Sequence, residues 1–189
     1  MSERIGDVEL VEPGDIWIFA YGSLMWDPGF ESSETRPAQL HGYHRAFCVS
    51  SMEYRGTPER PGLVLGLVRG GSCRGLAYRV AHARRRDVVV YLRRREIPEG
   101  IYLWRRVRVA TAEGRMFAYS FVVDPGHALY TGRLPFDEVA RRIVASEGAR
   151  GPNRAYLANT VRHLDELGLA DTTIHALRDA VERLAKARR

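Results

Sequence analysis

The chain has 189 residues, of which 45% are hydrophobic and 28% charged. This is ordinary composition for a globular domain with a stable core, and it excludes a disordered, collagen-like or disulfide-dense chain. No apolar run approaches the roughly 18 to 20 residues that a membrane helix needs, and the acidic N-terminus does not resemble a signal peptide. We therefore expect a cytoplasmic protein that binds no membrane.

The charge is basic and almost entirely arginine. Lysine and arginine together outnumber the acids 29 to 23, and Lys186 is the single lysine. A basic chain raises the question of nucleic acid, and the clusters Arg84–Arg86 and Arg93–Arg95 keep a basic nucleic-acid-binding or regulatory module as an alternative. These clusters lack the interleaved aromatic residues of a single-strand platform. We read the excess as mostly compositional and expect no nucleic-acid partner.

Short apolar segments separated by Gly, Pro and Ser predict β-strands in the first half of the chain. The predicted strands span residues 15–20, 38–51, 62–68 and 75–80. A hairpin is predicted from residues 102–109 and 116–123, with Glu113-Gly114 at its turn.

Helical spacing of apolar residues begins at His82 and continues to Glu96, and Pro98 should end that helix. The last third of the chain is predicted to be helical over residues 135–146, 153–167 and 172–188. Strands followed by helices indicate an α+β fold: a small mixed β-barrel or sheet with one inserted helix and C-terminal helices packed around it. We expect a polar leader over residues 1–15 and a single domain over residues 16–189.

The segment Tyr21-Gly22-Ser23-Leu24-Met25-Trp26 follows the first apolar strand. A glycine and a small hydroxyl residue in a tight loop can direct successive N–H groups at a carboxylate or an oxyanion. The simpler alternative, a β-turn whose aromatic residues enter the core, is favoured for an isolated segment of this kind. Ser23 is not expected to be a nucleophile, because the Gly-x-Ser-x-Gly elbow is absent.

Glu96 lies where the 82–96 helix should end, close to the negative end of the helix dipole. If its side chain faces the interior, burial raises the pKa of the carboxyl toward the range that a general acid or base needs. Spacing alone favours the other possibility, a solvent-exposed carboxylate paired with a neighbouring arginine.

Metal and disulfide chemistry are not indicated. Cys48 and Cys73 are expected to be buried thiols, and the six histidines show no ligand spacing.

Several segments, taken together, resemble one known family. They are the Tyr21–Trp26 segment, Gly42-Tyr43-His44-Arg45-Ala46-Phe47, Tyr54-Arg55-Gly56-Thr57-Pro58, Gly75-Leu76-Ala77-Tyr78-Arg79-Val80, Tyr91-Leu92 with Arg95-Glu96, Ala118-Tyr119, and Gly148–Gly151 with Asn153, Tyr156 and Leu157. In this order they are similar to the ChaC-like γ-glutamylcyclotransferases, over about residues 16 to 163.

The resemblance implies the γ-glutamylcyclotransferase-like barrel fold and the conversion of glutathione to 5-oxoproline and cysteinylglycine. It implies Glu96 as the catalytic residue, with no cofactor and no metal. The implied substrate-binding residues are Ile18, Phe19, Ala20, Tyr21, Gly22, Ser23 and Leu24. Because glutathione carries two carboxylates, we expect Arg45 and Arg55, which lie inside the matched motifs, to bind it as well, together with Tyr119. Glutathione is the expected small-molecule partner of a monomer or homodimer. Another γ-glutamyl amino acid or amine is the alternative substrate.

Overall fold

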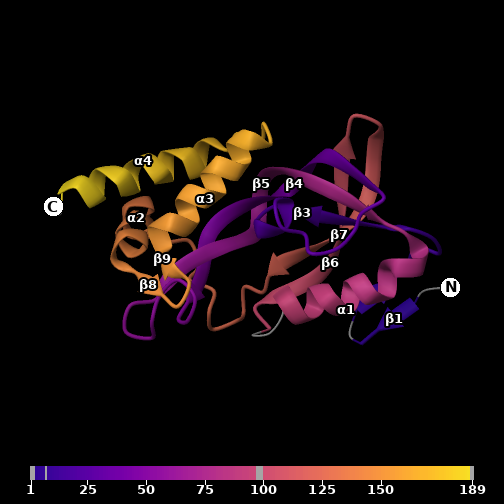
Figure 1. Cartoon of the computed structure of the whole chain (residues 1–189), viewed down its shortest axis with the longest axis horizontal. Coiled ribbons are helices and arrows are strands. Elements are labelled where there is room, and N and C mark those ends of the chain that lie inside the picture. Colours follow the sequence, from indigo (N-terminus) through magenta and orange to yellow (C-terminus); the bar gives the residue numbers. More distant parts are fainter. Residues whose placement is uncertain (1–2, 7, 97–99, 188–189) are drawn as a thin grey trace. The chain divides into compact units, whose positions relative to one another are not determined.

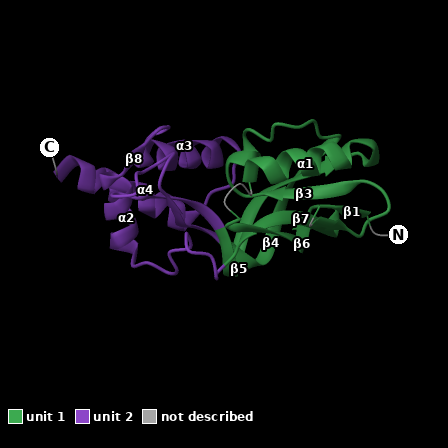
Figure 2. Ribbon diagram, turned by 90° about the horizontal axis from the view of Figure 1, so that it is seen from below, with its two compact units in different colours: residues 1–44, 67–124 green, residues 45–66, 125–189 purple. Residues whose placement is uncertain are grey.

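In the computed structural model the chain separates into two compact units (Figure 2). Unit 1 contains residues 1–44 and 67–124, and unit 2 contains residues 45–66 and 125–189. The structure describes residues 3–6, 8–96 and 100–187. Two long strands, β4 (Glu34–Ser51) and β5 (Gly62–Val80), each contribute residues to both units.

Unit 1 contains a closed β-barrel (Figure 1). Its strand order is β3 (Ile16–Ala20), β5, β4, β6 (Tyr102–Thr111) and β7 (Gly114–Val123). Ile18 of β3 is opposite Tyr78 in an antiparallel pair with β5 and opposite Tyr119 in a parallel pair with β7. Closure leaves no edge strand unpaired. The predicted α+β class and the predicted β6–β7 hairpin are confirmed.

One strand prediction is wrong. The segments 62–68 and 75–80 are not separate strands, because β5 runs without a break from Gly62 to Val80. Gly70 and Gly71 have φ of +101° and +69°, a region that residues with a Cβ rarely adopt. The glycines that appeared to interrupt the strand instead allow it to bend and continue.

The segment before β3 forms a small hairpin of β1 (Glu3–Ile5) and β2 (Val8–Leu10). The alternating apolar side chains Ile5, Val8 and Leu10 are buried. Arg85 then holds the following loop by donating hydrogen bonds to the carbonyl oxygens of Glu12 and Gly14, both at 2.9 Å. The division of the chain at residue 15 and the single domain remain predictions.

The helix inserted after β5 begins with a single 3-10 turn, η2 (His82–Arg84), and continues as α1 (Arg85–Glu96). Its apolar stripe of Val88, Val89 and Leu92 is buried, as amphipathic spacing predicts. Glu96 is its last residue. The predicted stop at Pro98 lies outside the described residues.

Unit 2 contains the three predicted C-terminal helices, α2 (Phe136–Ala145), α3 (Asn153–Glu166) and α4 (Thr172–Ala187). The short strands β8 (Glu147–Gly148) and β9 (Gly151–Pro152) pair between α2 and α3. Apolar residues of the three helices are buried: Ala140, Ile143, Leu157, Val161, Leu164, Ile174, Leu177 and Val181. No helix within the described residues is both long and apolar enough to cross a membrane.

His175 ties the start of α4 to the end of α3 within unit 2. Its Nε2 lies 2.7 Å from Asp165 Oδ1, and its Nδ1 lies 2.6 Å from the carbonyl oxygen of Asp171. Both neighbours accept hydrogen bonds, so the ring fits them best when both nitrogens carry protons. The hydrogen bond to Asp165 raises the pKa of His175 above its ordinary 6.5, and partial burial and the charge of Arg178 oppose this rise.

We expect a stability contribution of about 0.5 to 1 kcal/mol from protonated His175. Because the folded-state pKa is raised, this contribution is complete below pH 6.5 and is lost as the pH rises through the folded-state value. Urea unfolding from pH 5 to 9 should show this loss in the wild type but not in His175→Gln. The exposed His41, changed to Gln as the control, should leave the pH dependence unchanged.

Candidate active site

The Tyr21–Trp26 segment leaves the buried end of β3 and forms a 3-10 turn, η1 (Ser23–Met25). The amides of Met25 and Asp27 donate to the carbonyl oxygens of Gly22 and Ser23, both at 2.9 Å. The Tyr78 hydroxyl also fixes the turn, by donating to the carbonyl oxygen of Met25 at 2.7 Å. The expected local turn is therefore confirmed, but of its two aromatic residues only Tyr21 is buried, whereas Trp26 is partly exposed. Among the described residues, the backbone hydrogen bonds of the turn are donated by the amides of Met25, Trp26 and Asp27, not by those of Ser23 and Leu24.

The predicted substrate-binding residues of this segment differ in exposure. Gly22 and Ser23 are partly exposed. The others are buried side chains at 9% exposure or less: Ile18, Phe19, Ala20, Tyr21 and Leu24. Only the turn itself therefore presents groups to solvent, while β3 supplies the rigid support.

Glu96 is mostly buried. Its side chain is 20% exposed, so the solvent-exposed alternative that spacing favoured is wrong. Burial raises the pKa of Glu96 above 4.5, and the nearby charge of Arg95 and its hydrogen bond oppose that rise. The result is a carboxyl whose pKa is displaced toward neutrality, as acid–base catalysis requires.

Arg95 joins this carboxyl to the turn. Its Nε lies 3.0 Å from Glu96 Oε1, and its NH2 donates to the Ser23 hydroxyl oxygen at 3.3 Å. The end of α1 and the end of β3 thus meet within unit 1. From the sequence, Arg95 was named only as part of the Arg95-Glu96 motif and was given no role, because nothing in the run Arg93–Arg95 shows which arginine would contact Glu96.

Tyr119, a predicted substrate-binding residue, is buried and already hydrogen-bonded. Its hydroxyl donates to Glu12 Oε2 at 2.5 Å and accepts the Val11 amide at 2.9 Å. Burial, helped by Glu12, raises the pKa of Tyr119 to about 12. Burial alone would raise the pKa of Glu12 as well, but hydrogen bonds from Tyr119 and Arg106 lower it. Sequence reasoning missed Glu12, which lay in the predicted leader.

Arg45 and Arg55, also predicted to bind substrate, belong to unit 2. Arg45 is 3% exposed, and its Nε lies 3.3 Å from Asp171 Oδ2. The Arg55 guanidinium lies over the Tyr156 ring, 5.3 Å from its centroid. For these two residues, for Tyr119 and for the 18–24 segment, substrate binding remains a prediction.

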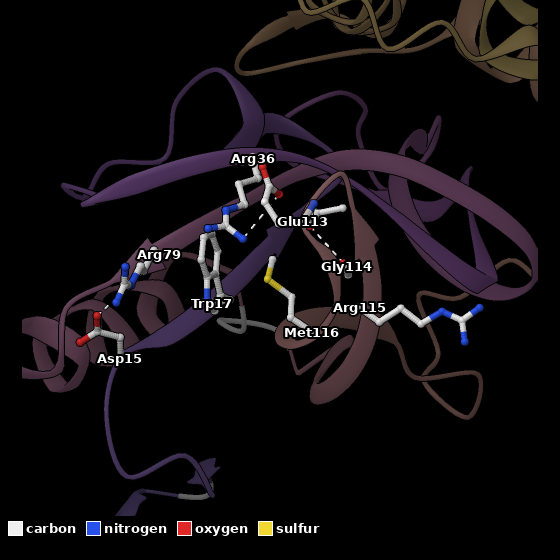
Figure 3. A pocket seen from close by; sticks show the side chains of 9 residues that line it. Asp15, Trp17, Arg36, Arg79, Glu113, Gly114, Arg115 and Met116 are labelled. Carbon is white, nitrogen blue, oxygen red and sulfur yellow. Dashed lines mark hydrogen bonds and ion pairs between the residues drawn. The ribbon is translucent and has the colours of Figure 1, made fainter.

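A cavity of about 510 Å³ lies elsewhere in unit 1, at the barrel end where β3 begins (Figure 3). Trp17 and Met116 line it side by side, and the Arg36 guanidinium lies 4.8 Å from the centroid of Trp17. Arg36 NH1 lies 3.5 Å from Glu113 Oε2, and Arg79 Nε lies 2.8 Å from Asp15 Oδ2 in a second ion pair. Because Arg36 and Arg79 already pair with the carboxylates Glu113 and Asp15, this cavity offers a weaker case for substrate binding than the Glu96 site.

Metal chemistry has no cluster to support it in the described part of the chain. Among those residues, no group of three or more His, Cys, Asp and Glu side chains could hold a metal ion.

Comparisons with known proteins match nearly the whole chain. The family described as ChaC-like protein matches residues 16–184. The glutathione-specific gamma-glutamylcyclotransferase of Escherichia coli K12 is 36% identical, with 92% of this chain and 75% of that protein covered. The glutathione-specific gamma-glutamylcyclotransferase 1 of Mus musculus is 32% identical, with coverage of 90% and 79%.

A solved structure supports the fold. The crystal structure of a yeast gamma-glutamyl cyclotransferase specific to glutathione superposes with a TM-score of 0.81, at 23% identity, covering 90% of this chain and 96% of that one. With the family match and the relatives above 30% identity, this agreement leads to one conclusion: the chain belongs to the ChaC-like protein family.

Proposed function

We propose that this protein is a glutathione-specific γ-glutamylcyclotransferase that converts glutathione to 5-oxoproline and cysteinylglycine. The observation that carries the proposal is the mostly buried carboxyl of Glu96, linked through Arg95 to Ser23 of the turn. The names of the bacterial and mammalian relatives support glutathione as the substrate.

The reaction closes a ring within the substrate. The α-amino nitrogen of the γ-glutamyl group attacks the γ-carbonyl carbon, and the bond from that carbon to the cysteinyl nitrogen breaks. Two protons move overall from the α-nitrogen to the leaving nitrogen. A carboxyl that alternates between its two protonation states can carry each proton in turn, and we assign this role to Glu96.

The protein must also hold the substrate in a folded conformation, because a well-oriented intramolecular attack gains several kcal/mol over an unoriented one. We assign this to the turn after β3. The amides of Ser23 and Leu24 and the Ser23 hydroxyl are donors that suit the α-carboxylate or the oxyanion of the tetrahedral intermediate. The chemistry calls for no electron acceptor and no bound nucleophile. We place the reaction in the cytoplasm.

Product analysis with glutathione as the sole substrate tests the proposal. We expect 5-oxoproline and cysteinylglycine in equal amounts, with no glutamate. Parallel assays with γ-glutamyl amino acids and γ-glutamylamines should give much lower kcat/KM. Higher kcat/KM for one of those compounds would replace glutathione as the substrate, whereas no 5-oxoproline from any of them would overturn the reaction itself.

A further inference from the structure

The guanidinium group of Arg95 contacts both parts of the proposed active site at once. Besides its Nε contact with Glu96, its NH1 donates to the carbonyl oxygen of Asp27 at 2.7 Å and to the Tyr91 hydroxyl at 2.9 Å. Its NH2 donates to Ser23 Oγ at 3.3 Å and lies 3.6 Å from Asp27 Oδ2. One side chain therefore links the last turn of α1 to the loop that follows β3.

A guanidinium group limits the hydrogen-bonding roles that its partners can take. Arginine only donates hydrogen bonds, so Ser23 Oγ must accept in this contact. The hydroxyl hydrogen of Ser23 is thus left to donate elsewhere. Arg95 likewise occupies Oε1 of Glu96, while Oε2 makes no hydrogen bond within the described residues.

We propose that Arg95 is a positioning residue that holds Glu96 by Oε1 and Ser23 by Oγ, so that Glu96 Oε2 exchanges the proton and the Ser23 hydroxyl donates to the substrate. The acceptor on the substrate is the α-carboxylate or the oxyanion that forms from the γ-carbonyl. This assignment rests on the proposed function and adds to it a residue that acts through two others.

The surroundings of Arg95 suit a guanidinium group that is held in one orientation better than one that moves. Its side chain is 21% exposed, and Tyr91, one turn earlier on α1, helps to orient it. The Tyr91 hydroxyl packs against the backbone of Gly29, where φ is +70° and a Cβ would clash with that hydroxyl. Lysine could replace the charge but not the planar set of donors.

Charge and geometry can be separated by two substitutions. The positive charge of Arg95 opposes the effect of burial on Glu96 and holds its pKa down. Arg95→Gln removes both the positive charge and the planar set of donors, so the pKa of Glu96 should rise. The acid limb of the kcat/KM profile, the fall in activity at low pH, should then move to higher pH. Arg95→Lys keeps the charge, so that limb should stay near the wild-type position while kcat/KM still falls.

The experiment measures kcat/KM for glutathione from pH 4.5 to 9 in the wild type, Arg95→Gln, Arg95→Lys and Arg94→Gln. We expect a loss of about 100-fold in Arg95→Gln, the size typical of a small misplacement of reacting groups. Arg94 is exposed and adjacent, and its variant should match the wild type. Ser23→Ala combined with Arg95→Gln should lose less than the product of the separate losses, because the two act together.

An Arg95→Gln profile with an unshifted acid limb would overturn the inference, as would Arg95→Lys with wild-type kcat/KM. If Arg95→Gln does not fold, kcat/KM of Arg95→Lys tests the inference by itself, and a wild-type value would overturn it. A wild type inactive on every γ-glutamyl compound would instead refute the proposed function. In that event the carboxyl ¹³C titration of Glu96, followed by NMR in the wild type and in Arg95→Gln, still tests whether Arg95 controls that carboxyl.

Discussion

Replacing Glu96 with glutamine should lower kcat for glutathione by about 10²- to 10⁴-fold, the usual contribution of a general acid–base group. Glutamine preserves the size of the side chain and its ability to accept the Arg95 hydrogen bond, but it cannot take or return a proton. Because the substitution leaves the turn after β3 unchanged, KM should change little, and the loss should appear equally in kcat and in kcat/KM.

The matched control is Glu113→Gln, which changes an exposed carboxylate at the β6–β7 turn and should leave turnover unchanged. Circular dichroism and thermal unfolding of both variants check the fold. Turnover retained by a natively folded Glu96→Gln would refute the assignment of Glu96.

The pH dependence offers a second measurement on the same residue. Glu96 must be deprotonated to accept the ammonium proton, and burial raises its pKa above 4.5. Activity should therefore decline as the pH falls through this raised value, before an ordinary glutamate would be protonated. In Glu96→Gln, any residual activity should lack this acid limb.

The elements with strong local patterns were predictable from the sequence. The stripe of Val88, Val89 and Leu92 predicted α1, and turn residues predicted the β6–β7 hairpin. Both depend on contacts and turn chemistry close in sequence. The continuity of β5 was not predictable, because Gly70 and Gly71 are equally typical of a turn and of a bent strand.

The site was only partly predictable for a related reason. The position of Glu96 at the end of α1 followed from local signals, but its burial depends on residues distant in sequence, and the rarity of buried glutamates favoured the wrong alternative. The contacts of Arg95 with Ser23 and Asp27, which are distant in sequence, were not predictable either. The role of Glu12 was likewise not predictable, because it depends on a hydrogen bond from Tyr119, which is 107 residues away in the sequence.

Substituting Asn153 with alanine should destabilise the protein more than most single changes do. Asn153 is the first residue of α3 and is fully buried. Its Oδ1 accepts the Leu63 amide at 2.7 Å, and its Nδ2 donates to the Leu63 carbonyl oxygen at 2.8 Å. The side-chain amide thus satisfies both backbone groups of a buried β5 residue, as a neighbouring strand would.

Alanine at position 153 leaves a buried donor and a buried acceptor without partners, each at a cost of about 1 to 3 kcal/mol, so the free energy of unfolding should fall by about 2 to 6 kcal/mol. Asn159, exposed on the same helix, provides the matched control, and its alanine variant should stay within about 0.5 kcal/mol of the wild type. Asn153→Asp keeps the acceptor but loses the donor and buries a charge, so it should also be strongly destabilised above neutral pH. Urea unfolding of the three variants measures these effects, and equal midpoints for Asn153→Ala and Asn159→Ala would show that the amide pair with Leu63 does not stabilise unit 2.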